Sequence, residues 1–128
     1  MRNAKSTRLA SVLVVLLITA VMAGVAVAPA GAATTAKHVT IQNFSFSPRT
    51  ITIKAGTKVV WKNTDGFTHH LASTNGIKTT AKITGMFSSG QMSKGSTFSF
   101  RYKKKGTFFY ECTIHASMAS MHGKVIVK

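Results

Sequence analysis

The 128-residue sequence is poor in acidic residues, with 2 Asp and Glu against 17 Lys and Arg and a formal net charge of +15. It has a single cysteine, Cys112, so no disulfide can form within the chain. No segment shows a convincing helical period, which argues against a helical bundle. The sequence supplies neither a clear substrate pocket nor an acid–base pair, and we therefore expect that the protein is not an enzyme.

The first 33 residues have the three parts of a secretory signal. Three cationic residues lie within the first eight positions, an uncharged and mostly apolar run covers Leu9–Val27, and small residues occupy positions 30–33. We predict a signal peptide over residues 1–33 or, because the apolar run is long, an N-terminal anchor. Residues 34–128 then form one small domain outside the cytoplasm, which is periplasmic, secreted or attached to the cell surface.

The predicted domain reads as short strands separated by turn residues. The clearest is 96–102, where Phe98, Phe100 and Tyr102 share one face and polar residues share the other, as in a half-buried strand. Seven such runs in a domain of this size predict an antiparallel β-sandwich. Residues 75–85 receive no assignment. The runs are His38–Phe46, Thr50–Lys54, Thr57–Lys62, Leu71–Thr74, Ser96–Tyr102, Thr107–Cys112 and Gly123–Lys128.

The lone cysteine has the neighbours of a metal ligand. A single extracytoplasmic cysteine is an exposed thiol, an intermolecular bridge or a ligand. Cys112 is followed by His115, Met118 and Met121, so one short segment carries a thiolate, an imidazole and thioethers, which are soft ligands suited to copper. We expect a metal site here.

A second imidazole comes from a pair of adjacent histidines, His69 and His70. Two histidines and a cysteine with a weak axial methionine form the ligand set of blue-copper electron-transfer sites, in which the geometry suits both oxidation states. The residues thus predict an electron carrier. They leave open whether His69 or His70 binds, and whether Met118 or Met121 is axial.

Several short sequence motifs, taken together in their order along the chain, resemble those of a known family. The chain resembles a cupredoxin, a type 1 blue copper protein of the plastocyanin, amicyanin and pseudoazurin group, over nearly all of residues 34–128. This resemblance implies a Greek-key β-sandwich that holds one copper ion and shuttles single electrons. The motifs are Phe46-Ser47-Pro48, Ile51 to Gly56, Trp61 to Asp65 ending in histidine, Met86 to Gly90, Gly95 with Phe98 and Phe100, Gly106 to Cys112, and Met121 to Val125.

The resemblance also implies roles for single residues. His69, eight positions after Trp61, corresponds to the first ligand histidine, and His70 takes the position that braces the ligand loop. Cys112 and His115 correspond to the thiolate and the second imidazole. The axial position departs from the family pattern: the resemblance favours Met121, because the strand that follows it would fix where its sulfur points, and Met118 is the alternative. We expect His38 and His122 at the surface.

The charge suggests partners. Residues 34–128 keep 14 of the cations against 2 acids, about +12, which would attract acidic redox proteins such as a cytochrome, an oxidase or a reductase to the uncharged loop around His115. The same charge suits an anionic membrane or cell-wall surface.

The run 103–105 predicts a solvated turn rather than a nucleic-acid site, since no aromatic residues alternate with its lysines. We expect a monomer; the competing functions are copper delivery or storage, and metal-free adhesion.

Overall fold

A computed structural model describes residues 35–128, so the predicted leader lies outside the described part of the chain. Within residues 35–128, no helix is long and apolar enough to cross a membrane. The elements are β1 (Lys37–Gln42), β2 (Ser45–Ser47), β3 (Thr50–Ile53), β4 (Lys58–Asn63), β5 (His69–Thr74), β6 (Ile83–Met92), β7 (Thr97–Arg101), β8 (Gly106–Cys112), the 3-10 helix η1 (Ala119–Met121) and β9 (His122–Val127).

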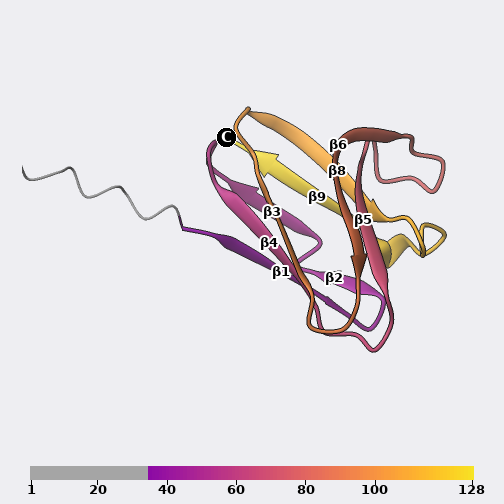
Figure 1. Cartoon of the computed structure of the whole chain (residues 1–128). Coiled ribbons are helices and arrows are strands. Elements are labelled where there is room, and N and C mark those ends of the chain that lie inside the picture. The colour runs from indigo at the N-terminus through magenta and orange to yellow at the C-terminus, as the bar shows by residue number, and fades with distance from the viewer. Residues whose placement is uncertain (1–34) are drawn as a thin grey trace, which may run out of the picture. The chain divides into compact units, whose positions relative to one another are not determined.

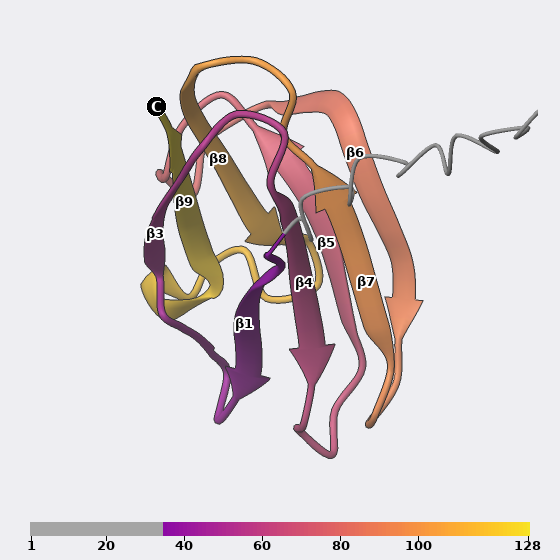
Figure 2. The same ribbon diagram turned by 90° about the vertical axis from the view of Figure 1, so that its left-hand side faces the viewer.

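These strands form two sheets, which confirms the predicted β-sandwich. One sheet has the order β2-β1-β4-β7 and the other the order β3-β9-β8-β5-β6 (Figures 1 and 2). The expectation that all strands would be antiparallel is wrong, because β1 pairs with β4 and β3 pairs with β9 in parallel. Both parallel pairs join strands that are not consecutive in the chain, and a crossover connection, unlike a hairpin, allows this direction.

Two predicted elements differ from the structure. The run 38–46 is not one strand, because Asn43 and Phe44 both have φ of 50° and turn the chain from β1 into β2. Such left-handed backbone is uncommon for residues other than glycine. The ten-residue β6 was missed; its side chains are mostly exposed, and Gly85 and Gly90 interrupt the alternation that marks a strand.

The core between the sheets consists of alternating strand residues with large aromatic rings. Trp61 is fully buried and packs against Phe87, Phe98 and Tyr110, with ring centroids 5.3 to 5.6 Å away. The predicted face of β7 is confirmed, since Phe98 and Phe100 pack against this cluster. Buried hydrophobic residues run from Val39 to Val127, so residues 35–128 have a core of their own.

Candidate metal centre

Strand pairing brings the predicted ligands together from distant parts of the sequence. In the antiparallel pair β5–β8, Leu71 lies opposite Cys112, which places His69 near the end of β8 where Cys112 lies. The chain then turns, with the His115 N–H donating to the Cys112 carbonyl over 3.0 Å. The turn returns the His115 side chain to the thiol.

Three donor atoms converge on one point. The Cys112 Sγ lies 3.5 Å from the His69 Nδ1 and 3.4 Å from the His115 Nδ1. One ligand atom from each residue lies within 4.8 Å of the others, in a group that could hold a metal ion. Donors bound about 2 Å from one ion in a trigonal plane would lie roughly 3.5 Å apart, so the spacing fits a bound ion.

The surroundings of the three donor atoms favour metal binding. Cys112 and His69 are completely buried, and His115 is partly exposed. A buried thiol that packs only against apolar groups is inert, but here the sulfur faces two imidazole nitrogens and receives a long contact, 3.5 Å, from the His70 backbone N–H. A soft thiolate with two imidazoles suits copper, so the donor set fits the metal that the sequence predicts.

Asp65 fixes the ring of His69. Its Oδ2 lies 2.9 Å from the His69 Nε2 and also accepts from the Phe44 N–H, while its Oδ1 accepts from the Asn43 N–H. Burial alone would raise the pKa of Asp65, but the backbone N–H groups of Phe44 and Asn43, together with His69, lower it below 3.8. An ionised carboxylate at Nε2 keeps the proton on that nitrogen and leaves Nδ1 free as a donor.

His70 points away from the three donors. Its Nδ1 lies 2.6 Å from the Thr113 Oγ1 and its Nε2 lies 2.8 Å from the Ser88 Oγ, so both ring nitrogens have partners outside the cluster. The Thr113 N–H donates to the His70 carbonyl over 2.8 Å. The structure therefore groups His69 rather than His70 with Cys112. His70 instead connects β5 to Thr113, the first residue after β8.

The loop from Thr113 to Met118 (the ligand loop) has two turns. After the first, the Met118 N–H donates to the His115 carbonyl over 2.9 Å, and the Met121 N–H then donates to the Met118 carbonyl over 2.9 Å. The His115 ring packs edge-on against Phe44, with centroids 5.0 Å apart. Burial and then the neighbouring His69 lower the pKa of His115 below its ordinary 6.5, which favours the neutral ring that a metal needs.

The two methionines occupy different environments. Met121 is completely buried at the end of η1, directly before β9, whereas Met118 is 41% exposed. Behind Met121, Gly123 lies opposite Tyr110, and a Cβ on this glycine would lie 2.1 Å from the Tyr110 ring. Only glycine lets the tyrosine cover the backbone there, so the start of β9 is tightly fixed next to Met121.

His122 is not at the surface as expected, because it is 1% exposed. Its Nε2 lies 2.7 Å from the Ala116 carbonyl of the ligand loop, and its Nδ1 lies 3.5 Å from the Glu111 carboxylate. Burial raises the pKa of Glu111, although His122 acts in the other direction. His122 thus supports the ligand loop from the side of β9. His38 is exposed, as predicted.

Sequence reasoning missed three supporting residues: Asp65, Phe44 and the buried His122. A signal for Asp65 was present, because the domain has only two acidic residues and one of them precedes the predicted ligand by four positions. The contacts of Phe44 depend on the left-handed turn 43–44, and of these two residues only Asn43 is of a type that often adopts such backbone.

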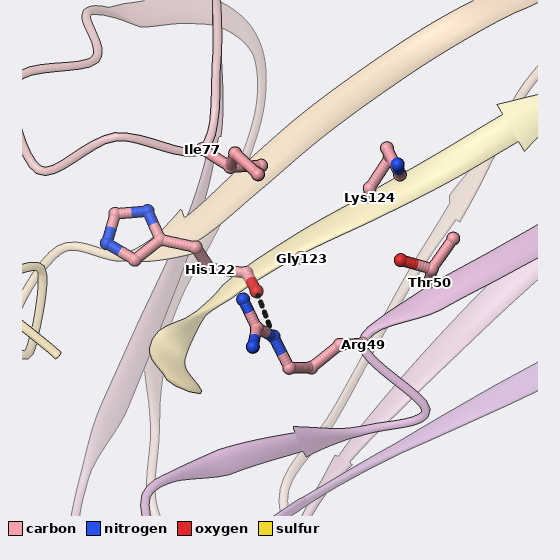
Figure 3. Close-up of a pocket in the computed structure, with 6 residues that line it drawn as sticks. All are labelled: Arg49, Thr50, Ile77, His122, Gly123 and Lys124. Carbon is pink, nitrogen blue, oxygen red and sulfur yellow. Dashed lines mark hydrogen bonds between the residues drawn. The ribbon is translucent and has the colours of Figure 1, made fainter. Parts of the chain in front are cut away.

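A pocket beside the centre does not offer an alternative site. It is lined by residues at the starts of the paired strands β3 and β9. Figure 3 shows the Arg49 side chain reaching the His122 carbonyl, with the His122 ring turned away. Its lining holds no carboxylate or thiol, and nothing in it pairs an acid with a base. The lining residues are Arg49, Thr50, Ile77, His122, Gly123 and Lys124.

Comparisons with known proteins agree with the geometry. The family model described as copper binding proteins, plastocyanin/azurin family, matches residues 33–128. Amicyanin-alpha of Methylorubrum extorquens is 33% identical over 79% of this chain and 76% of its own length. The chloroplastic plastocyanin B of Populus nigra is 33% identical over 66% of this chain, but only 52% of its own length is covered.

A solved structure shows the same fold. The purple cupredoxin of Nitrosopumilus maritimus matches 72% of this chain and 99% of its own, with a TM-score of 0.63 and 24% identity. The matched family is one of copper-binding proteins, and amicyanin and plastocyanin are not enzymes, in agreement with the prediction that this chain is not one.

Proposed function

Because the chain belongs to the plastocyanin/azurin family of copper-binding proteins, we propose that it carries single electrons outside the cytoplasm, with copper held by His69, Cys112, His115 and Met121. The observation that carries this proposal is the convergence of the His69 Nδ1, the Cys112 Sγ and the His115 Nδ1. Met121 is proposed as the axial ligand because it is buried and fixed by β9, whereas Met118 is exposed.

Copper bound to these donors would supply a one-electron couple, Cu(I)/Cu(II). The protein supplies a site that keeps its shape. Asp65 holds the His69 ring, His70 connects β5 to the ligand loop, and His122 supports that loop at Ala116. Side chains held by such supporting contacts move little when the charge of a bound ion changes, which favours rapid electron exchange.

The exposed surface around His115 suits brief contacts with a redox partner. Phe67, Ile114 and Met118 are 58%, 51% and 41% exposed, and none carries a charge. Between Glu111 and Lys124 the sequence contains no Asp, Glu, Lys or Arg. We propose that an acidic redox protein, such as a cytochrome, an oxidase or a reductase, contacts this apolar patch, and that lysines elsewhere increase the rate of encounter.

Spectra and kinetics test the proposal. Adding Cu(II) should produce intense visible absorption and a narrow copper splitting in the spin-resonance spectrum, as a thiolate-bound type 1 site does. Electron self-exchange should be fast, and transfer to an acidic partner should slow as salt is added. A protein that binds Cu(I) tightly but exchanges electrons slowly would instead be a delivery or storage protein. Weak colour with normal folding would refute the site itself.

A further inference from the structure

The cationic residues of the domain are concentrated at the end farthest from the three donors. Eight of the 14 Lys and Arg side chains of residues 34–128 lie where β1 and β4 begin, where β3, β7 and β9 end, and in the turn before β8. We call this set the basic pole. Its members are Lys37, Lys54, Lys58, Arg101, Lys103, Lys104, Lys105 and Lys128.

Backbone contacts hold the segments of the basic pole together. The Ala55 N–H donates to the Lys128 carbonyl over 3.1 Å, the Gly56 N–H donates to the Tyr102 carbonyl over 2.7 Å, and the Arg101 guanidinium donates to the Gly56 carbonyl over 2.6 Å. In Figure 1 the C-terminus, the orange turn before β8 and the start of β1 lie on the left, and the ligand loop lies on the right. The charges therefore form one surface of the fold.

No acidic side chain of residues 35–128 neutralises this surface. The two acidic side chains of the domain are Asp65 and Glu111, and both are buried near the three donors. The ion pairs that the described residues form join them to His69 and His122. The β8 strand runs from Gly106 at the basic pole to Cys112, six residue steps that span about 20 Å. Residues 35–128 are thus cationic at one end and formally uncharged on the exposed ligand loop.

We propose that the basic pole binds the anionic lipid surface of a membrane and leaves the ligand loop facing away from it. Apolar groups beside the lysines favour lipid over a soluble polyanion. One hollow at this pole is lined by Met86, Phe100 and Phe108 together with Arg101, Lys103 and Lys104, and Met86 is 37% exposed. Cations next to apolar side chains match the boundary between lipid headgroups and acyl chains.

Two further features favour the same occupant. β1 begins at this pole, and the apolar run Leu9–Val27, for which an N-terminal anchor is one of the two predictions, precedes β1 in the sequence. A second copy of the chain would bring like charges together, which disfavours self-association through this surface. The basic pole does not use the ligands, so the proposal does not depend on copper chemistry.

Vesicle binding of residues 34–128, which contain the whole described core, tests the proposal. Co-sedimentation should occur with phosphatidylcholine vesicles that contain phosphatidylglycerol, but not with phosphatidylcholine alone. The pole variant replaces Lys103, Lys104 and Lys105 with Gln. Since each cation near an anionic surface contributes about fivefold in affinity, this variant should bind roughly a hundredfold more weakly.

A matched control removes the same charge elsewhere. Lys62→Gln, Lys78→Gln and Lys94→Gln together change three exposed lysines outside the basic pole, and this control should lose only severalfold in affinity. Unchanged circular dichroism and thermal midpoints would show that both variants fold. Equal losses in the two triple variants would overturn the proposal, because net charge rather than the pole would then govern binding.

Two more measurements separate lipid from other partners. Met86→Gln keeps the charge and should weaken vesicle binding severalfold without changing the binding of heparin, a soluble polyanion. Tighter binding to heparin than to vesicles would overturn the proposal in favour of a polyanion site. Hydrogen exchange on vesicles should slow at residues 54–57 and 103–106 and stay unchanged at 113–118; the reverse pattern would refute the orientation.

Discussion

The carboxylate of Asp65 should lower the reduction potential of the copper-loaded protein. Its Oδ2 lies 2.9 Å from the His69 Nε2, on the side of the imidazole ring opposite the donor Nδ1. With a metal–nitrogen bond of about 2 Å, the carboxylate would lie roughly 7 Å from an ion held at Nδ1. At this distance a unit charge at an effective dielectric constant of 20 changes the energy by about 2 kcal/mol per unit of charge on the ion.

Asp65→Asn removes this charge and keeps the size of the side chain. The oxidised ion carries one more positive charge than the reduced ion, so the negative carboxylate stabilises the oxidised state. Its loss should raise the potential by about 100 mV, the equivalent of about 2 kcal/mol for one electron. The amide cannot accept from all three N–H groups that contact Asp65, and we expect the metal-free variant to lose about 1–3 kcal/mol of stability.

Protein-film voltammetry or a redox titration measures this potential. Lys62→Gln serves as the control, because it removes an exposed charge near the end of β4 and should change the potential far less, owing to solvent screening. A potential in Asp65→Asn that matches the control, or one that falls, would refute the electrostatic role. Loss of stability without a shift in potential would leave Asp65 as a structural residue only.

Three other predictions follow from the same site. Met121→Ala should alter the visible and spin-resonance spectra of the copper protein and Met118→Ala should not; the opposite result would make Met118 the axial ligand. Removing copper should lower the thermal midpoint, since an ion present at a hundred times its dissociation constant stabilises the fold by about 2.7 kcal/mol, and an unchanged midpoint would argue against binding at folded ligands. In the metal-free protein, burial and His69 lower the pKa of His115 below 6.5, so the unfolded state takes up the proton first. Stability in urea should therefore fall as the pH drops through that value, and His115→Gln should reduce the slope; an equal slope would contradict this cause.

The three side chains that the structure brings together could be predicted from the sequence, because they depend on local spacing next to strands with clear patterns. Cys112 and His115 lie on one turn after an aromatic strand, and His69 follows Trp61 at a spacing that the family resemblance identifies. The alternation of Phe98 and Phe100 likewise predicted β7. Each of these signals lies within about ten residues and needs no knowledge of the partner strand.

Features that depend on contacts between distant segments could not be predicted in this way. The β6 strand pairs with β5 through two register shifts, and most of its side chains are exposed. Its sequence therefore shows no alternation of apolar and polar residues. His122 looked like a surface residue, yet the pairing of Glu111 with His122 across β8 and β9 buries it against the ligand loop. The polar character of His122 suggested that it is exposed, but the register of β8 and β9 places it in the interior.

The positions of the charges in the fold also could not be predicted from the sequence. Composition alone therefore does not say which surface binds a partner. A net charge of +15 predicts attraction to any anionic partner. Topology makes the prediction specific, because it gathers eight cations at one end of the strands and places both acidic side chains near the three donors at the other. If both proposals hold, the domain is held through one end while its uncharged loop stays free for a redox partner. Membrane binding and the copper site would then depend on separate residues, so substitutions in the basic pole should leave the spectra of the bound copper unchanged.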